Sequence, residues 1–137
     1  MPNISTDNKA IKKLLGEAKI IAVVGLSPEP DKPSHEVAQY LQSQGYKIVP
    51  VRPGADEILG EKVYASLKDI PFKVDIVDVF RKPEHMHQVV DEALAIRPKA
   101  VWMQLGISNE AAATKASQAG LQVVEDRCIL IEHKKNF

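Results

Sequence analysis

The residues best suited to chemistry lie between positions 25 and 34, in a loop that follows a short apolar run and precedes a helical pattern. Gly25 lets the backbone approach a ligand closely, while Ser27, Ser34 and Lys32 supply hydroxyl donors and a cation. A strand, followed by a loop and then by the start of a helix, is an arrangement typical of phosphate binding. Free backbone N–H groups at the helix start and the helix dipole both attract anions. The same residues also fit an ordinary surface loop in which Ser34 caps the helix.

Two familiar nucleotide motifs are incomplete in this loop. Gly25 is its single glycine, so the G-x-G-x-x-G pattern of dinucleotide-binding domains is missing. Lys32, Pro33 and Ser34 resemble the end of a Walker A loop, but Pro33 has no N–H donor and the upstream glycine is absent. The pattern therefore excludes nucleoside triphosphate hydrolysis and argues against a standard dinucleotide site.

A second basic position follows the next apolar run, which ends in Val51, Arg52 and Pro53. NAD-binding domains place an acidic residue there to hold the ribose hydroxyls. Arg52 instead suits a ribose phosphate, as in NADP or in the 3′-phosphorylated adenosine of coenzyme A. The alternative is a solvated loop arginine.

Two further loops carry candidate ligand contacts. Phe80 is placed to cover an adenine or a pantetheine arm and Arg81 to face a phosphate, although Phe80 also fits as the last residue of the core. Gln104 and Gly106 offer an amide side chain and a permissive backbone, which we expect opposite Gly25. Alternatively, Gly106 only turns the chain into the next helix.

These loops need a scaffold that brings them together, and the periodicity predicts one. Five apolar runs predict strands that are buried on both faces, as a parallel sheet requires: residues 20–24, 47–51, 74–80, 100–104 and 122–125. Between them we predict a helix over residues 34–44, one starting at Pro83, and one capped by Ser108 and ended by Gly120. Residues 55–71 are predicted to be a loop with a brief turn around 66–70.

This alternation predicts an α/β fold, a single doubly wound, Rossmann-like five-stranded parallel sheet with helices on both faces, in one domain over residues 1–137. Such sheets bind ligands beyond the carboxyl ends of their strands, which is where all the candidate loops lie.

The composition of the chain argues against nucleic-acid binding, membrane insertion and secretion. Lysine plus arginine and aspartate plus glutamate both number 18, so no broad positive field favours nucleic acid. Residues 1–13 are polar and unlike a secretory signal, and no apolar run is long enough to span a membrane. With Cys128 as the single cysteine, no internal disulfide can form, and we expect a cytoplasmic protein.

Several segments in order carry a family resemblance: Val24-Gly25-Leu26-Ser27, Lys32-Pro33-Ser34, Pro50-Val51-Arg52-Pro53, Asp78-Val79-Phe80-Arg81, Trp102-Met103-Gln104-Leu105-Gly106 and Glu125-Asp126-Arg127-Cys128. Taken together, they resemble the stand-alone CoA-binding proteins, which are similar to the CoA-binding, Rossmann-like domain of the succinyl-CoA synthetase alpha subunit. The resemblance implies coenzyme A or an acyl-CoA as ligand.

The resemblance also implies a role for each loop. Gly25, Leu26 and Ser27 would line the phosphates, and Lys32, Pro33 and Ser34 would close the same loop. Val51, Arg52 and Pro53 would flank the adenosine, while Val79, Phe80 and Arg81 would lie near the middle of the cofactor. Arg52 departs from the asparagine that we expect more often in this family.

Catalysis by this chain is not expected, because in the synthetase the phosphorylated histidine lies in a second domain. His85 and His87 do not converge on a metal, and Asp75 and Asp78 face opposite sides of a strand. We therefore expect a non-catalytic carrier, sensor or partner module. The alternatives are an NADP-binding oxidoreductase or redox sensor, and an interaction domain with a vestigial site.

Two expectations concern surfaces and thiols. Trp102 and residues 129–131 are candidates for a homodimer or enzyme-partner surface. Cys128 lies near the expected ligand edge and could form a mixed disulfide with the cofactor thiol, the alternative being a small buried residue.

Overall fold

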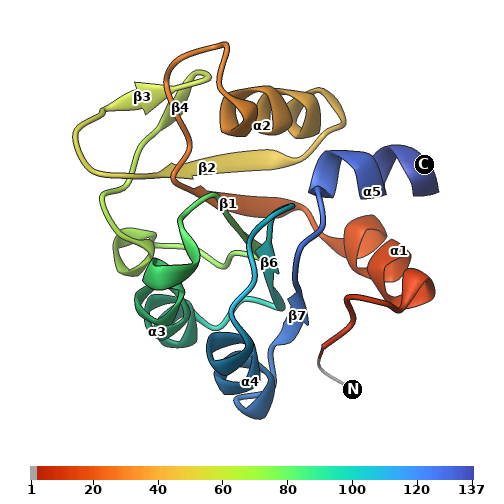
Figure 1. The fold of residues 1–137 in the computed structure, drawn as a ribbon. Coiled ribbons are helices and arrows are strands. Elements are labelled where there is room, and N and C mark those ends of the chain that lie inside the picture. Colours follow the sequence, from red (N-terminus) through yellow and green to blue (C-terminus); the bar gives the residue numbers. More distant parts are fainter. Residues whose placement is uncertain (1–2) are drawn as a thin grey trace.

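The computed structural model describes residues 3–137 and contains the predicted parallel sheet (Figure 1). The five-stranded sheet has the order β2-β1-β5-β6-β7, and all four pairings are parallel. Its strands are β1 (Ile20–Val24), β2 (Lys47–Val51), β5 (Ile76–Val79), β6 (Ala100–Met103) and β7 (Gln122–Val124). From β1 the chain moves outward to β2 and then returns to the opposite side of β1 with β5. The strand order therefore reverses between β1 and β5, the usual position of a ligand site in this architecture.

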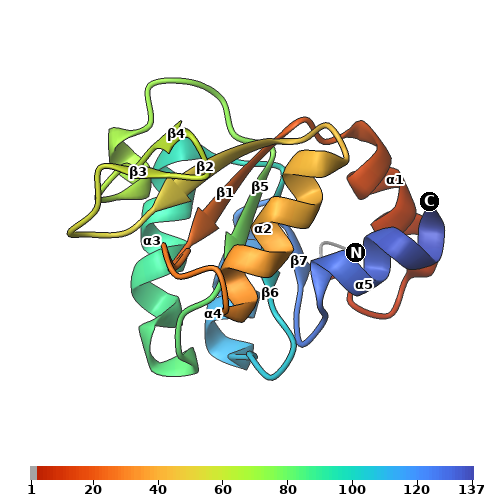
Figure 2. The same ribbon diagram turned by 90° about the horizontal axis from the view of Figure 1, so that it is seen from above.

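Helices cover both faces of the sheet, as predicted (Figures 1 and 2). They are α1 (Asn8–Glu17), α2 (Pro33–Ser43), α3 (Met86–Ile96), α4 (Glu110–Gln118) and α5 (Ile129–Asn136). Ile21 and Val23 of β1 belong to the core beneath α1, α2 and α5, whereas Ala22 and Val24 belong to the core against α3 and α4. The strands are apolar along their whole length because both of their faces are covered.

The predicted crossover helices are present, with adjusted ends. Pro33 rather than Ser34 begins α2, and Pro83 opens a short 3-10 turn, η2 (Pro83–His85), that leads into α3. The prediction that Ser108 caps α4 is wrong. Asn109 is the cap, because its Oδ1 accepts the N–H of Ala112 at 3.0 Å.

Helices α1 and α5 were not predicted. Helix α1 buries Ile11, Leu14 and Leu15 on one side, while lysines occupy the other. Its apolar positions are spaced for a helix, but the lysines between them give the segment a polar average.

The proposed dimer surface is wrong for Trp102. The Trp102 side chain is fully buried, and its Nε1 donates to the carbonyl oxygen of Arg127 at 2.8 Å. Ile129 is also fully buried, in the first turn of α5, whereas Ile131 remains 52% exposed. Helix α5 folds back over the sheet and removes most of this apolar surface from solvent.

The segment over residues 55–71 contains the predicted turn, η1 (Leu67–Asp69), and two very short antiparallel strands, β3 (Glu57–Ile58) and β4 (Glu61–Lys62). Tyr64 then pairs with the outer edge of β2. Its N–H donates to the carbonyl of Pro50 at 3.0 Å, and its carbonyl accepts the N–H of Arg52 at 2.9 Å. The backbone of Arg52 is therefore held in place although it lies beyond the end of β2.

No helix within residues 3–137 has both the length and the apolar character needed to cross a lipid bilayer.

Candidate functional site

Three adjacent strands end at one level of the sheet, because Val24 of β1 pairs with Val51 of β2 and Val79 of β5. The next residues to leave these strands are Gly25, Arg52 and Phe80. The parallel register thus gathers residues that lie far apart in the sequence at the point where the strand order reverses.

A hollow of about 230 Å³ opens at this position, and five predicted site residues line it: Gly25, Val51, Arg52, Pro53 and Arg81. A second hollow of about 180 Å³ continues toward α3 and shares Val51, Arg52, Pro53 and Arg81 with the first. We call this second hollow the α3 pocket. Its remaining lining residues are Val24, Ala65, Leu67, Gln88, Val89 and Glu92.

Two half-buried arginines dominate the charge of the hollow. The Nε of Arg52 donates to the carbonyl of Pro53 at 3.2 Å, and Arg81 places its Cδ beside Gly25. Neither guanidinium forms an ion pair with any of residues 3–137. Two cations without a carboxylate partner around one hollow make it suited to an anion with more than one phosphate.

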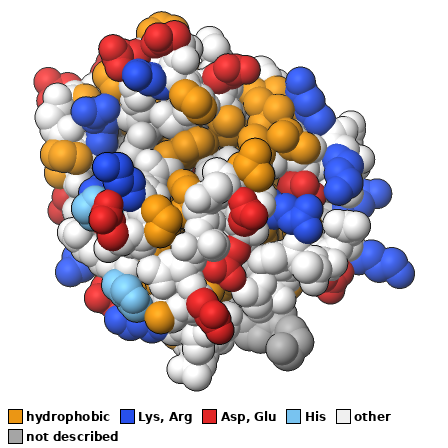
Figure 3. All heavy atoms as spheres, viewed as in Figure 1, with side chains coloured by type: hydrophobic (Ala, Val, Ile, Leu, Met, Phe, Trp, Pro, Cys, Tyr) orange, Lys and Arg blue, Asp and Glu red, His pale blue; other side chains and the backbone are white. Residues whose placement is uncertain are grey.

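The charges on the surrounding surface are mixed. Figure 3 shows hydrophobic side chains gathered in the upper half of this view, with basic and acidic side chains interspersed around them. A chain with equal numbers of acidic and basic residues has no broad field to attract an anion. Attraction of phosphate at this edge therefore depends on the local arginines.

The loop over residues 25–34 is closed by its own hydrogen bonds. The Ser27 N–H donates to Ser34 Oγ at 2.9 Å, the Ser27 carbonyl lies 2.9 Å from Nδ1 of His35, and Ser27 Oγ accepts the N–H of Glu29. Ser34 and His35 are buried, whereas Lys32 and Pro33 are exposed. Ser34 therefore shapes the loop.

The backbone of this loop retains donors for a ligand. Gly25 uses its N–H on the carbonyl of Val51, at 2.9 Å. The N–H groups of Leu26 and of Ser34, in the first turn of α2, have no acceptor within residues 3–137. The side chain of Leu26 is fully buried, so only its backbone can contact a ligand. Free amides beside a helix start attract phosphate.

Other predicted site residues lie apart from this hollow. Val79 is fully buried in the core against α3, and Phe80 is half-buried against the core beneath α2. Gln104 and Gly106 follow β6, which is separated from β1 by β5, and neither residue lines the hollow. The Gly106 N–H donates to Oδ1 of Asp126 at 2.7 Å, which ties it to the loop after β7.

Gln104 contacts a buried carboxylate, a pairing that the residue pattern did not predict. Its Nε2 donates to Oδ1 of Asp78 at 2.5 Å, while Oδ2 of Asp78 has no partner within residues 3–137. Burial raises the pKa of Asp78 from the ordinary 3.8 to about 8, against an opposing effect of the Gln104 hydrogen bond. Asp78 is therefore mainly a neutral acid at pH 7. An aspartate inside an otherwise apolar run was the signal available in the sequence.

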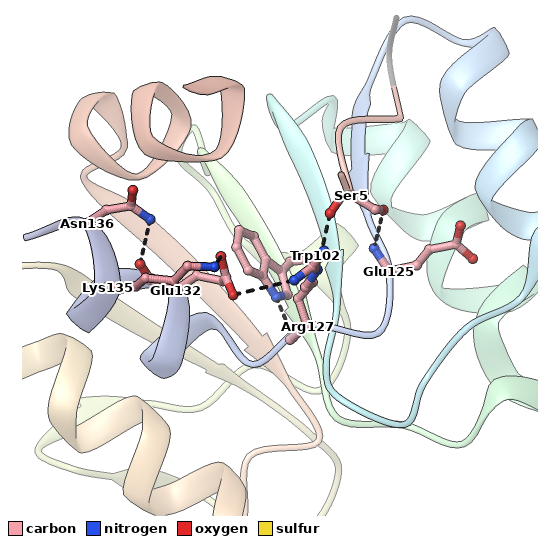
Figure 4. A network of polar contacts seen from close by, with 7 residues as sticks. All are labelled: Ser5, Trp102, Glu125, Arg127, Glu132, Lys135 and Asn136. Atoms are coloured by element: carbon pink, nitrogen blue, oxygen red, sulfur yellow. Dashed lines mark hydrogen bonds and ion pairs between the residues drawn. The ribbon is translucent and has the colours of Figure 1, made fainter. Parts of the chain in front are cut away.

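The loop after β7 holds the chain start and α5 together (Figure 4). Arg127 donates from Nε to the Ser5 carbonyl at 3.1 Å and lies 3.9 Å from the buried Glu132 carboxylate, and the Glu125 N–H donates to Ser5 Oγ at 2.8 Å.

Cys128 precedes α5, is half-buried and packs against the core beneath α2. It does not line either hollow.

Residues 3–137 contain no cluster of histidine, cysteine and acidic side chains able to hold a metal ion. In particular, His85 lies in η2 and His87 in the first turn of α3.

A family model described as a CoA binding domain matches residues 19–134. The uncharacterized protein YneT of Bacillus subtilis is 44% identical over 123 residues, which cover 90% of this chain and 91% of YneT. A hypothetical protein from Pyrococcus horikoshii has a solved structure with a TM-score of 0.93 and 38% identity, covering 98% of this chain and 95% of its own.

An enzyme also contains a similar segment. The ADP-forming acetate–CoA ligase II of Archaeoglobus fulgidus is 36% identical over 95 residues, which are 67% of this chain but only 14% of the ligase. The similarity is thus to a small part of that protein.

Proposed function

The chain belongs to the CoA binding domain family, and we propose that the hollow between Gly25, Arg52 and Arg81 binds coenzyme A or an acyl-CoA. The observation that carries the proposal is the pair of half-buried arginines without carboxylate partners at the point where the strand order reverses. Coenzyme A has three phosphates in two places, a 3′-phosphate and a 5′-pyrophosphate. Two separate cations around one hollow match that distribution.

The proposal assigns a part of the ligand to each element. Arg52, beyond β2, holds the 3′-phosphate of the ribose, with Val51 and Pro53 beside the adenosine. Arg81 and the free amide of Leu26 hold the pyrophosphate near the start of α2. Phe80, which precedes Arg81 and is half-buried against the core beneath α2, is assigned to the pantetheine arm where that arm leaves the hollow. The cofactor supplies a thiol for acyl transfer, and this chain's residues bind and orient it.

We further propose that the chain acts as a non-catalytic carrier, sensor or partner module over one domain, residues 1–137. The supporting observation is that the ligase relative matches this chain over only 14% of its own length.

Calorimetry with coenzyme A, 3′-dephospho-CoA and NADP tests the proposal. We expect coenzyme A to bind and 3′-dephospho-CoA to bind at least about tenfold more weakly, since a hydrogen bond to a charged group contributes about 1.5–3 kcal/mol. Arg52→Ala should abolish that difference between the two ligands, whereas Arg81→Ala should weaken both.

Lys9→Ala on α1 is the matched control for the loss of one positive charge and should bind as the unmodified protein does. Absence of coenzyme A binding would refute the proposal. Tighter binding of NADP than of coenzyme A would favour the redox alternative, which Arg52 also suits.

A further inference from the structure

A chain of polar contacts forms one wall of the α3 pocket. The Oγ of Ser66 donates to Oε1 of Glu92 at 2.6 Å, and the Leu67 N–H donates to the same oxygen at 3.3 Å. The other carboxylate oxygen, Oε2, accepts Nε2 of Gln88 at 3.4 Å. Gln88 and Glu92 both line the pocket, one helical turn apart on α3.

These contacts orient the amide of Gln88. A carboxylate only accepts hydrogen bonds, so Glu92 draws the NH₂ group of Gln88 toward itself and leaves the carbonyl Oε1 on the opposite side. Glu92 is itself held from the other end by Ser66 and Leu67. Gln88 is exposed and lines the pocket, and its contact with Glu92 favours the amide orientation that leaves one N–H and the carbonyl oxygen available to a ligand.

Apolar side chains line much of the rest of the pocket. Val24, Val51, Leu67 and Val89 supply apolar walls, while Arg52 and Arg81 lie on the side shared with the phosphate hollow. Apolar walls with a few placed polar groups are typical of small-ligand sites. A nucleoside whose phosphates lie at the two arginines would direct its base into this pocket.

The orientation of Gln88 selects between bases. Adenine presents an amine donor beside a ring-nitrogen acceptor, the pattern that a glutamine amide matches with two hydrogen bonds. Hypoxanthine and guanine present an oxygen instead of the amine, which would face the Gln88 carbonyl oxygen. If the Gln88 amide rotated to donate to the purine 6-oxygen, its NH₂ group would lose the contact with Glu92. The Gln88 carbonyl oxygen would then face the Glu92 carboxylate, and two acceptors repel each other.

We propose that Gln88, oriented by Glu92, selects adenine over 6-oxopurines in the α3 pocket. Gln88 contacts the base, and Glu92 is a positioning residue. This inference rests on the proposed function and adds to it the group that reads the base.

The test is calorimetry with adenosine 3′,5′-bisphosphate and inosine 3′,5′-bisphosphate, which carry the same phosphates and differ at the base. The unmodified protein should prefer adenosine by about tenfold, within the range of one paired amide–base contact. Gln88→Ala and Glu92→Gln should both reduce this preference toward one. Gln39→Ala, an exposed glutamine on α2, is the matched control and should keep it.

The ratio of the two affinities separates selection from general damage, since a loosened helix weakens both ligands equally. Equal losses for both ligands in Gln88→Ala, or equal affinities in the unmodified protein, would overturn this inference while leaving coenzyme A binding intact. If the unmodified protein binds neither bisphosphate nor coenzyme A, the proposed function itself is overturned.

Discussion

The carbonyl oxygen of Phe80 lies against the backbone of Gly25, so close that a Cβ built on Gly25 would stand 2.7 Å from it. Gly25 also has a φ of +87°, in the region that favours glycine. The backbone segments that follow β1 and β5 therefore approach each other closely at Gly25, which has no side chain. This packing explains the glycine at position 25 even before a ligand is considered.

Gly25→Ala should destabilise the protein for two reasons, backbone strain and contact with the Phe80 carbonyl. Gly54→Ala is the matched control, since Gly54 has a φ of +80° but no atom within 4 Å of its Cβ position. We expect Gly25→Ala to lower the free energy of unfolding by about 1–3 kcal/mol more than Gly54→Ala, the usual cost of overpacking. Urea denaturation measures both, and equal losses would show that the Phe80 contact contributes nothing.

Asp78 should make the free energy of unfolding depend on pH between about pH 4 and about pH 8. Burial holds its folded pKa at about 8, above the ordinary 3.8, so the folded state retains the proton more tightly than the unfolded chain. The free energy of unfolding contributed by this group therefore falls as pH rises from about 4 to about 8, by at most about 1.4 kcal/mol per pH unit.

The variant Asp78→Asn lacks this ionisation and approximates the neutral acid in shape. Its stability relative to the unmodified protein should increase steadily between about pH 5 and about pH 8. Thermal unfolding of both proteins across that range is the measurement. A difference that stays constant with pH would mean that Asp78 does not titrate there.

His133 should give a pH dependence of the opposite sense. It is buried on α5 among the rings of Tyr40, Tyr46 and Phe137, with its Nδ1 2.7 Å from the Tyr40 hydroxyl. Burial lowers the pKa of His133 below the ordinary 6.5. Its contribution to stability is complete above pH 6.5 and is lost as pH falls toward the lower folded value.

His133→Phe retains an aromatic ring without the titrating group. Between about pH 7.5 and about pH 5, the melting temperature of the unmodified protein should fall more than that of this variant. Parallel curves for the two proteins would exclude His133 as the source of the acid sensitivity.

The residue pattern was enough to predict the sheet, its crossover helices and the edge where a ligand site is expected. Continuous apolar runs require cover on both faces, and Gly45 and Gly120 mark helix ends by themselves. The resemblance carried by the loops also indicated the family. Helices α1 and α5 escaped prediction because charged residues interrupt short amphipathic patterns.

The tertiary structure decided which candidates act together. The strand order placed β5 between β1 and β6, so Arg81 joined Arg52 at the hollow while Gln104 turned inward to Asp78. Sequence spacing records the end of each strand but does not specify which strands become neighbours. That choice depends on how the helices pack across both faces, a non-local property, and it also created the α3 pocket around Gln88.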